Sequence, residues 1–274
     1  MSATITATDI NKLRQATGAG MLDCRKALTE SNGDFEAAID WLRKQGQKVA
    51  AKRSDREAKE GVIIAKTTAD NRAGLVICIS CETDFVSKNS DFVAFAQSIA
   101  DAAVKNNVKS VEELNEVTVN GAKVSEMIND KLASIGEKIA ISKFERVDAP
   151  YVASYIHGAN RMGVLVGMTK ENAEAGKDVA MQIAAMNPLA IDESSISPET
   201  IAREKDIAIE QIKAEGKPAE MAEKIALGKV NKFFKENTLL AQAFVKDNSK
   251  SVADYLKSAG TDLSVTEFRR VALG

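Results

Sequence analysis

The stretch "GVIIAKTTADNRAGLVICIS" (Gly61–Ser80) decides the fold class. Its two ends, "GVIIAKT" and "GLVICIS", are short apolar runs rich in β-branched residues, and they flank the turn-rich "TADNRAG". Runs of this kind on either side of a turn are typical of a β-hairpin. The chain repeats the pattern later, where "YVASYIHG" and "MGVLVGMT" flank a second short turn. We therefore expect two antiparallel hairpins.

Each hairpin is followed by apolar residues at helical spacing. After the first hairpin these are Phe92, Phe95, Ile99 and Ala103; after the second they are Val179, Ile183 and Met186. A recurrence every three to four residues marks the buried face of a helix. A hairpin followed by a helix, twice, predicts an α+β protein whose core has two related halves. The last alternating run, "LSVTEFRRVAL", is expected to complete the sheet of the second half.

Residues 1–46 predict three short helices. Thr8 is the expected cap of the first helix, "TGAG" separates it from the second, and Asp34 is the expected cap of the third, which ends at Gly46. Residues with helical spacing give these helices a common core: Ile10, Leu13, Cys24, Ala27, Leu28, Phe35, Ala38, Ile39 and Leu42. The unit resembles a ubiquitin-associated (UBA-like) three-helix bundle.

A second helical region follows the core. Residues 198–237 are helical and charged, and "EGKP" (215–218) predicts a turn between two antiparallel arms. Ile201, Ala208 and Ile212 form a stripe on the first arm; the second carries Met221 and Ile225 on one side and Leu227, Val230 and Phe234 on another. The expected domains are 1–46 (bundle), 47–60 (linker), 61–147 (first core half), 148–197 (start of the second half), 198–237 (protruding helical hairpin) and 238–274 (completion of the second half).

Composition excludes several function classes. The 274 residues carry 37 basic and 39 acidic side chains, so the net charge of −2 provides no general field for nucleic acid. The linker has five basic residues and three acidic ones. We favour a solvated connection, because the interleaved acids weaken attraction to phosphate; the alternative is an arm that binds nucleic acid. No apolar run approaches the roughly 20 residues that span a bilayer. We expect a cytoplasmic protein that binds neither membrane nor nucleic acid.

No catalytic or metal-binding pattern stands out. Cys78 and Cys81 are three apart in a predicted strand, so their sulfurs face opposite sides, and a single histidine cannot complete a metal shell. We interpret the cysteines as structural and expect no cofactor. Phosphate loops and nucleophile elbows are absent from the sequence. His157, at the tip of the second hairpin, is a turn residue, a surface contact or a general base without a visible partner.

The stretch "TDFVSKNSDFV" (Thr83–Val93) contains Asp-Phe-Val twice. The second copy suits the start of a helix, with Ser90 as its cap and Phe92 on the buried face. The first copy lies in a short connection in which Thr83 can cap a single turn. Composition favours a Phe85 that tucks into the core; the alternative is an exposed aromatic wedge beside the Asp84 carboxylate, aimed at a partner.

Four long motifs resemble bacterial translation elongation factor Ts. They are "LRQATGAGMLDCRKALTESNGDFEAAIDWLR" (Leu13–Arg43), "CETDFVSKN" (Cys81–Asn89), "YIHGANRMGVLV" (Tyr155–Val166) and "GKPAEMAEKIALGKVNKFFKE" (Gly216–Glu236). The resemblance runs in order through nearly the whole chain. Some members of the family continue into a further C-terminal helical module, and we expect the contacts of that module to be absent from a chain that stops at Gly274.

The resemblance implies a guanine-nucleotide exchange factor, without covalent chemistry, for the GTPase EF-Tu in its GDP-bound and nucleotide-free forms. Asp84 and Phe85 are then the pair that enters the GTPase and dislocates its Mg²⁺, with Thr83 and Val86 framing them. Arg14, Met21 and Leu22 match a further contact region, in which Leu22 stands where methionine is common, and His157 matches another.

Three questions stay open at this point. The helical hairpin is expected to contact either the GTPase or a second copy of the chain. The UBA-like bundle could make the protein a non-catalytic binding module for another partner, since fold alone does not fix function. A metabolic enzyme is the third class, and it would need converging titratable groups.

Overall fold

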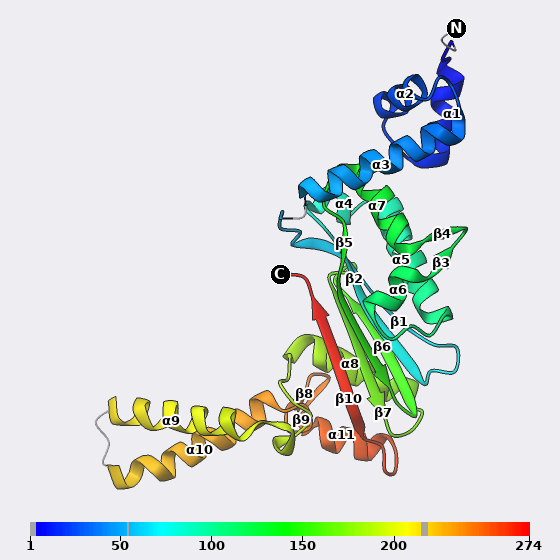
Figure 1. Cartoon of the computed structure of the whole chain (residues 1–274). Coiled ribbons are helices and arrows are strands. Elements are labelled where there is room, and N and C mark those ends of the chain that lie inside the picture. The colour runs from blue at the N-terminus through cyan, green and yellow to red at the C-terminus, as the bar shows by residue number, and fades with distance from the viewer. Residues whose placement is uncertain (1–3, 54, 215–218) are drawn as a thin grey trace. The chain divides into compact units, whose positions relative to one another are not determined.

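The computed structural model describes residues 4–53, 55–214 and 219–274. The chain divides into two compact units. The first is built from the residues up to Lys66, from Val76–Glu145 and from Val271–Gly274; the second is built from Thr67–Leu75 and Arg146–Arg270. Each unit contains most of one three-stranded sheet, with helices packed against it (Figure 1).

The helices are α1 (Ala7–Thr17), α2 (Met21–Glu30), α3 (Phe35–Arg53), α4 (Asp84–Ser87), α5 (Ser90–Lys105), α6 (Val111–Glu116), α7 (Val124–Ile135), α8 (Ala173–Met186), α9 (Pro198–Ala214), α10 (Ala219–Asn237) and α11 (Val252–Ala259), with a 3-10 turn at Glu193–Ser195. The strands are β1 (Glu60–Thr67), β2 (Ala73–Cys81), β3 (Thr118–Val119), β4 (Ala122–Lys123), β5 (Ala140–Asp148), β6 (Tyr151–His157), β7 (Met162–Met168), β8 (Ala243–Phe244), β9 (Asp247–Ser251) and β10 (Val265–Ala272).

The two large sheets have the same strand order. In the first, β5 lies beside the second strand of the hairpin, giving β1-β2-β5; in the second, β10 takes the equivalent place, giving β6-β7-β10. The pairing of β6 with β7 is antiparallel and runs without a break from Tyr151 opposite Met168 to His157 opposite Met162. Both predicted hairpins, the two related halves and the closing role of the last strand are confirmed. Strand β5 had no clear signal in the sequence.

The core of the second unit forms where α8 packs on its sheet. Val164, Val166 and Met168 of β7 are buried together with Val179 and Ile183 of α8. Gly176 lets the helix approach the sheet, because a β-carbon there would lie 2.7 Å from that of Ala153. The predicted helix face on α8 is confirmed for Val179 and Ile183, whereas Met186 at the end of the helix is 46% exposed.

The three N-terminal helices enclose the predicted small core. Leu13, Cys24, Ala27, Leu28 and Ala38 are buried in it, and Ile10, Phe35, Ile39 and Leu42 pack against it. The predicted cap of the first helix was wrong. Thr6 caps α1, because its hydroxyl accepts the Asp9 N–H while the Asp9 carboxylate accepts the Thr6 N–H, a reciprocal capping box. The predicted cap of the third helix is confirmed, since Asp34 Oδ1 accepts the Ala37 N–H at 2.9 Å.

The predicted end of the third helix at Gly46 was also wrong, because α3 continues to Arg53. Gly46 is buried where α3 packs on α7, and a β-carbon on it would stand 2.8 Å from the β-carbon of Ala133. The glycine permits close helix packing instead of ending the helix. Much of the expected linker is therefore helical.

Helices α9 and α10 run antiparallel (Figure 1). The pair contains two separate apolar clusters. Ala208 and Ile212 are buried against Ala226, with Ile225 packed beside them. Nearer the sheet of the second unit, Val230 and Phe234 pack with Ala190 and Ile196, and Ile201 lies against them. The stripe on the first arm is confirmed, and Leu227 is left 60% exposed. The expected turn at 215–218 lies outside the described residues.

Candidate partner-binding site

The two Asp-Phe-Val copies occupy opposite environments, and this contrast defines the candidate site. In the second copy Phe92 is 2% exposed and forms part of the buried face of α5. In the first copy Phe85 is 85% exposed on α4, a single helical turn that Glu82 and Thr83 separate from the end of β2. The exposed alternative for Phe85 is therefore the one the structure adopts. The cap of α5 is Asn89 instead of the predicted Ser90, because the Asn89 Oδ1 reaches the N–H groups of Asp91 and Phe92.

Asp84 presents a carboxylate beside the exposed ring. Its Oδ2 lies 2.6 Å from Lys88 Nζ, one helical turn further on, and the side chain of Asp84 is 46% exposed. The hydrogen bond from Lys88, together with its charge, lowers the pKa of the Asp84 carboxyl below its usual value. An ionised, accessible carboxylate next to an accessible aromatic ring can meet both polar and apolar groups of a partner.

A groove of about 390 Å³ borders Phe85. Val86 and Phe92 line it from α4 and α5, and Lys131 and Ile135 line it from α7. Val86, the residue after the exposed Phe85, is half-buried and faces this groove on the first unit. A partner that receives the Phe85 ring can also place apolar surface in this groove.

Two carboxylates that the sequence did not predict as functional, those of Glu82 and Glu137, hold the segment before α4. The Glu137 carboxylate accepts a hydrogen bond from the Thr83 N–H, and the Glu82 carboxylate accepts one from the Lys138 N–H. The segment before α4 and the segment after α7 are thereby joined. Glu82 also meets Arg53 at 2.8 Å and Arg56 at 3.1 Å. The signal that could have suggested these roles was the acidic residue directly before the Thr-Asp-Phe-Val motif; Glu137 carried none, because 54 residues separate it from Thr83.

The N-terminal bundle presents a second accessible surface. Leu22 is 81% exposed and Met21 45% exposed in the first turn of α2, and Arg14 is exposed on α1. Buried residues of the same helices point inward, so these three side chains are not required for the small core. Their role as a contact region stays a prediction.

His157 lies at the end of β6, next to the hairpin turn, as predicted. Its Nδ1 is 3.0 Å from the Tyr155 hydroxyl, and the two rings face each other at a tilt with their centroids 5.9 Å apart. The histidine therefore has a partner that the sequence did not reveal. Tyr155 fixes an exposed imidazole on the surface of the second unit, an arrangement suited to a surface contact.

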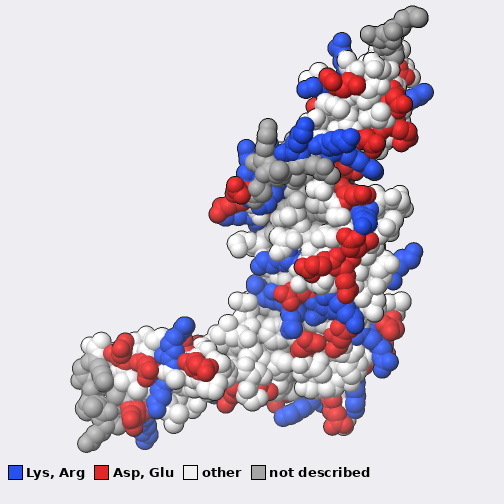
Figure 2. All heavy atoms as spheres, viewed as in Figure 1, with Lys and Arg blue, Asp and Glu red and all other residues white. Residues whose placement is uncertain are grey.

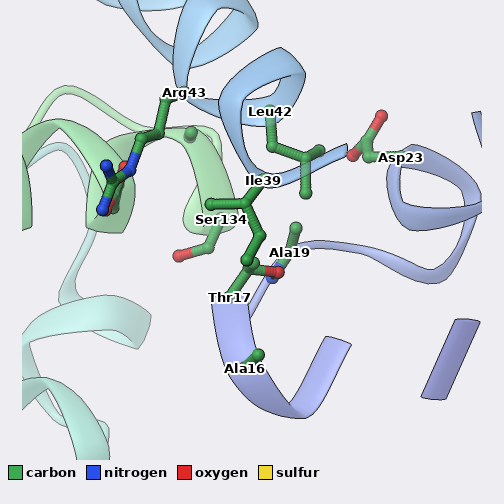
Figure 3. Close-up of a pocket in the computed structure, with 10 residues that line it drawn as sticks. Ala16, Thr17, Ala19, Asp23, Ile39, Leu42, Arg43 and Ser134 are labelled. Carbon is green, nitrogen blue, oxygen red and sulfur yellow. The ribbon is translucent and has the colours of Figure 1, made fainter. Parts of the chain in front are cut away.

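A partly open hollow of about 220 Å³ lies within the first unit, where the bundle meets α7 (Figure 3). Ile39 and Leu42 of α3 line it on one side together with Thr17, the last residue of α1, and Ala19, which lies between α1 and α2. Ser134 of α7 also lines it. Burial raises the pKa of the Asp130 carboxyl at its wall, and the nearby Arg43 opposes that shift. The hollow belongs to the packing of α3 on α7.

The cysteines are buried and free, as expected for structural residues. Burial, with the Glu137 charge adding to it, raises the pKa of the Cys81 thiol to about 12. The described part of the chain holds no cluster of three or more His, Cys, Asp or Glu side chains arranged for a metal ion. Over the same residues, none of the helices combines the length and apolarity needed to cross a membrane. On the face shown in Figure 2, basic and acidic side chains intermix.

Comparison with known proteins identifies the family. The family described as Elongation factor TS matches residues 82–274. The Elongation factor Ts of Christiangramia forsetii is 50% identical over 275 residues, covering 99% of this chain and 100% of the relative. That of Flavobacterium psychrophilum is also 50% identical over 275 residues, and that of Clostridium perfringens is 43% identical over 282 residues, covering 98% of this chain and 93% of the relative.

Similarity at this level over the whole length defines a translation elongation factor. The chain belongs to the elongation factor Ts family.

Proposed function

We propose that the chain is a guanine-nucleotide exchange factor for the translational GTPase EF-Tu and acts in the cytoplasm. The observation that carries the proposal is the 85% exposure of Phe85 on a short helix whose base is fixed to the first unit. Phe85 is exposed whereas Phe92, the phenylalanine of the second copy, is buried, and aromatic side chains are enriched in the cores of protein–protein interfaces. Membership of the elongation factor Ts family supports the choice of partner.

In the proposed mechanism Phe85 and Asp84 insert between helices of the GTPase domain. Mg²⁺ bridges the nucleotide phosphates and protein ligands, so moving the supports of the metal weakens GDP binding without any bond being made or broken. Because coupling between two ligands is reciprocal, GDP weakens binding of the factor by the same ratio. Exchange then passes through a nucleotide-free complex that incoming nucleotide dissociates.

The remaining candidate residues divide between affinity and positioning. Arg14, Met21 and Leu22 provide an accessible surface on the bundle that adds affinity for the GTPase. His157, held by Tyr155, provides a contact from the second unit. Val86 frames the wedge, since it is half-buried at the groove beside Phe85.

Release of a fluorescent GDP analogue from EF-Tu tests the proposal directly. The wild-type chain at increasing concentration, with free Mg²⁺ held fixed, is expected to accelerate release to a maximal rate. Heat-denatured chain serves as the control. A release rate that stays at the spontaneous value across all concentrations would refute the proposed function.

The alternative is a binding module that uses the N-terminal bundle for a different partner. The exposed Leu22 and Met21 favour it, because they form an apolar surface without need of Phe85. The full chain and its Leu22→Ser and Phe85→Ala variants would be compared in affinity capture from a cell extract. Capture of a protein other than EF-Tu that depends on Leu22 but not on Phe85 would support this alternative.

A further inference from the structure

Thr83, the residue directly before the wedge, has its polar groups engaged within the first unit. Its N–H donates to Glu137 Oε2 at 3.0 Å, and its hydroxyl donates to Glu137 Oε1 at 2.6 Å. Its carbonyl accepts from the Cys81 thiol at 3.2 Å and from the Ser87 N–H at 3.3 Å. The hydroxyl does not cap α4, although Thr83 stands at the capping position. Thr83 therefore directs both its N–H and its hydroxyl to Glu137 within the first unit.

Glu137 is well placed to hold this segment. Helix α7 ends at Ile135, and Gly136 follows in the left-handed conformation (φ 79°), which turns the chain so that Glu137 comes next to the end of β2. The same Oε2 that binds Thr83 also accepts the Glu82 N–H at 3.1 Å. One carboxylate thus binds three donors from two consecutive residues. Hydrogen bonds to an ionised acceptor are the stronger kind.

Glu82 in turn accepts a hydrogen bond from the residue that follows Glu137. Its Oε1 accepts the Lys138 N–H at 2.6 Å and Arg53 Nη1 at 2.8 Å, and its Oε2 meets Arg56 Nη1 at 3.1 Å. Two segments are thereby joined, because the carboxylate of each accepts hydrogen bonds from backbone N–H groups of the other segment. We name this arrangement, made by Glu82, Thr83, Glu137 and the Lys138 N–H, the carboxylate clasp.

The wedge itself supplies little to fix its own position. Helix α4 has four residues, none of them buried, and an isolated turn of helix is unstable in water. Phe85 is mostly exposed, and Asp84 bonds to Lys88 on the same turn. The clasp acts at the residues immediately before α4. A binding element that is already ordered loses less conformational entropy when it binds.

We propose that Glu137 is a positioning residue that acts through Thr83 to hold Phe85 in its inserting orientation. This assignment rests on the proposed exchange function and deepens it. It also changes the role of Thr83, which serves the clasp and does not touch the GTPase. Val86 and the groove then lie beside the Phe85 ring, while Glu137 fixes the position of Thr83, the residue directly before α4.

The test is a double-mutant cycle on GDP release from EF-Tu. For wild type, Glu137→Ala, Phe85→Ala and the double variant, the maximal release rate is measured at saturating factor concentration, separately from the half-maximal concentration. We expect Glu137→Ala to lower the maximal rate about tenfold, and to have little further effect once Phe85 is alanine, because residues that act as a unit are not additive. Leu22→Ser, combined with each variant, is the additivity control, since its site lies on the bundle.

Conservative variants separate positioning from structure. Glu137→Gln keeps an oxygen for the two N–H groups and offers an amide N–H to the Thr83 hydroxyl, so it is expected to restore most of the rate. Thr83→Val removes the hydroxyl alone and should give a smaller loss than Glu137→Ala. Glu116→Ala, which removes a carboxylate 67% exposed in a surface ion pair with Lys123, is the matched control and should leave the rate unchanged.

Hydrogen exchange gives a readout independent of activity. The Glu82 and Thr83 amides should exchange faster in Glu137→Ala than in wild type, while the amides of β7 in the second unit are unchanged. If Glu137→Ala is unfolded by circular dichroism, Thr83→Val replaces it in the cycle. A wild-type maximal rate in a folded Glu137→Ala, or an equal loss with and without Phe85, overturns the positioning role alone. Failure of the wild type to release GDP overturns the proposed function and this assignment with it.

Discussion

Gly46 of α3 and Ala133 of α7 are in such close contact that a β-carbon added to the glycine would lie 2.8 Å from the β-carbon of the alanine. The same added atom would lie 3.5 Å from the Asn129 carbonyl oxygen. Helix α3 passes through this point without interruption and ends seven residues later, at Arg53. The contact ties the N-terminal helices to α7, and Glu137 follows the end of that helix by two residues.

Gly46→Ala is expected to destabilise the first unit. Alanine favours a helix over glycine by about 1 kcal/mol, but the clash with Ala133 outweighs that gain, because overpacking costs roughly 1–3 kcal/mol. Gly228→Ala is the matched control, since Gly228 also lies in a helix and an added β-carbon meets no atom within 4 Å. Urea unfolding should show a lower midpoint for Gly46→Ala and a higher one for Gly228→Ala. Equal increases for both would show that α3 and α7 separate at no cost.

The two phenylalanines of the repeated tripeptide should respond in opposite ways to the same substitution. Phe85→Ala should change stability by less than about 0.5 kcal/mol, because the ring is exposed, yet slow GDP release about 10- to 100-fold. Phe92→Ala removes a buried ring and should cost about 3–5 kcal/mol. Thermal unfolding and GDP release at fixed Mg²⁺ measure both. Wild-type release by Phe85→Ala would remove the wedge from the mechanism.

Leu22→Ser tests whether the bundle supplies affinity separately from exchange. The side chain is 81% exposed, so the fold should be unaffected, while the factor concentration for half-maximal GDP release should rise about tenfold. The maximal rate should stay at the wild-type value, because the wedge is intact. Leu189→Ser, at a leucine 61% exposed in the second unit, is the matched control. A lower maximal rate with an unchanged half-maximal concentration would contradict this division.

The clasp predicts a defined acid sensitivity. The hydrogen bond from the Lys138 N–H, with those from Arg53 and Arg56, lowers the pKa of Glu82 from its ordinary 4.5 to about 2. A carboxyl with a lowered folded-state pKa stabilises the fold above its unfolded-state pKa and loses that contribution as the pH falls through the folded-state value. Glu82→Gln should therefore be less stable than wild type at pH 7, by about 1.5–3 kcal/mol, the usual contribution of hydrogen bonds to a charged group.

The difference between wild type and Glu82→Gln should shrink between pH 4.5 and pH 2, the range set by those two pKa values. Urea titrations at several pH values measure it. Glu57→Gln is the control, because that carboxylate is exposed and pairs with Lys59 on the surface. A stability difference that stays constant down to pH 2 would show that the Glu82 charge is not the stabilising feature.

The distal part of the helical hairpin is expected to serve association and not exchange. Its cluster of Ala208, Ile212 and Ala226 is separate from the cluster of Val230 and Phe234 with Ala190 and Ile196. Replacing residues 205–226 with a short Gly-Ser link should thus leave the second unit folded and maximal GDP release unchanged. Sedimentation should then show a smaller assembly, of the chain with itself or with EF-Tu. Unchanged mass and affinity would show the distal hairpin to be dispensable for association.

Local sequence patterns were sufficient for most of the architecture. Alternation and turn residues predicted both hairpins, and helical spacing predicted the buried faces of α2, α5 and α9, because those periodicities arise within a few residues. The same reasoning assigned the second Asp-Phe-Val copy to the start of an apolar helical face, which is confirmed, but for the first copy it favoured a buried Phe85, which was wrong. The family motifs then indicated which exposed residues to expect at a partner surface.

Tertiary structure decided what depends on residues far apart in the chain. Gly46 carries a local signal for a helix end, and only the approach of α7 shows that it is a packing contact. Thr83 carries a local signal for a cap, yet its hydroxyl binds Glu137, 54 residues further on. The exposure of Phe85 likewise follows from where the fold places α4. A side chain's periodicity is a property of its own segment, whereas its hydrogen-bond partner and its burial are set by whichever segments the topology brings beside it.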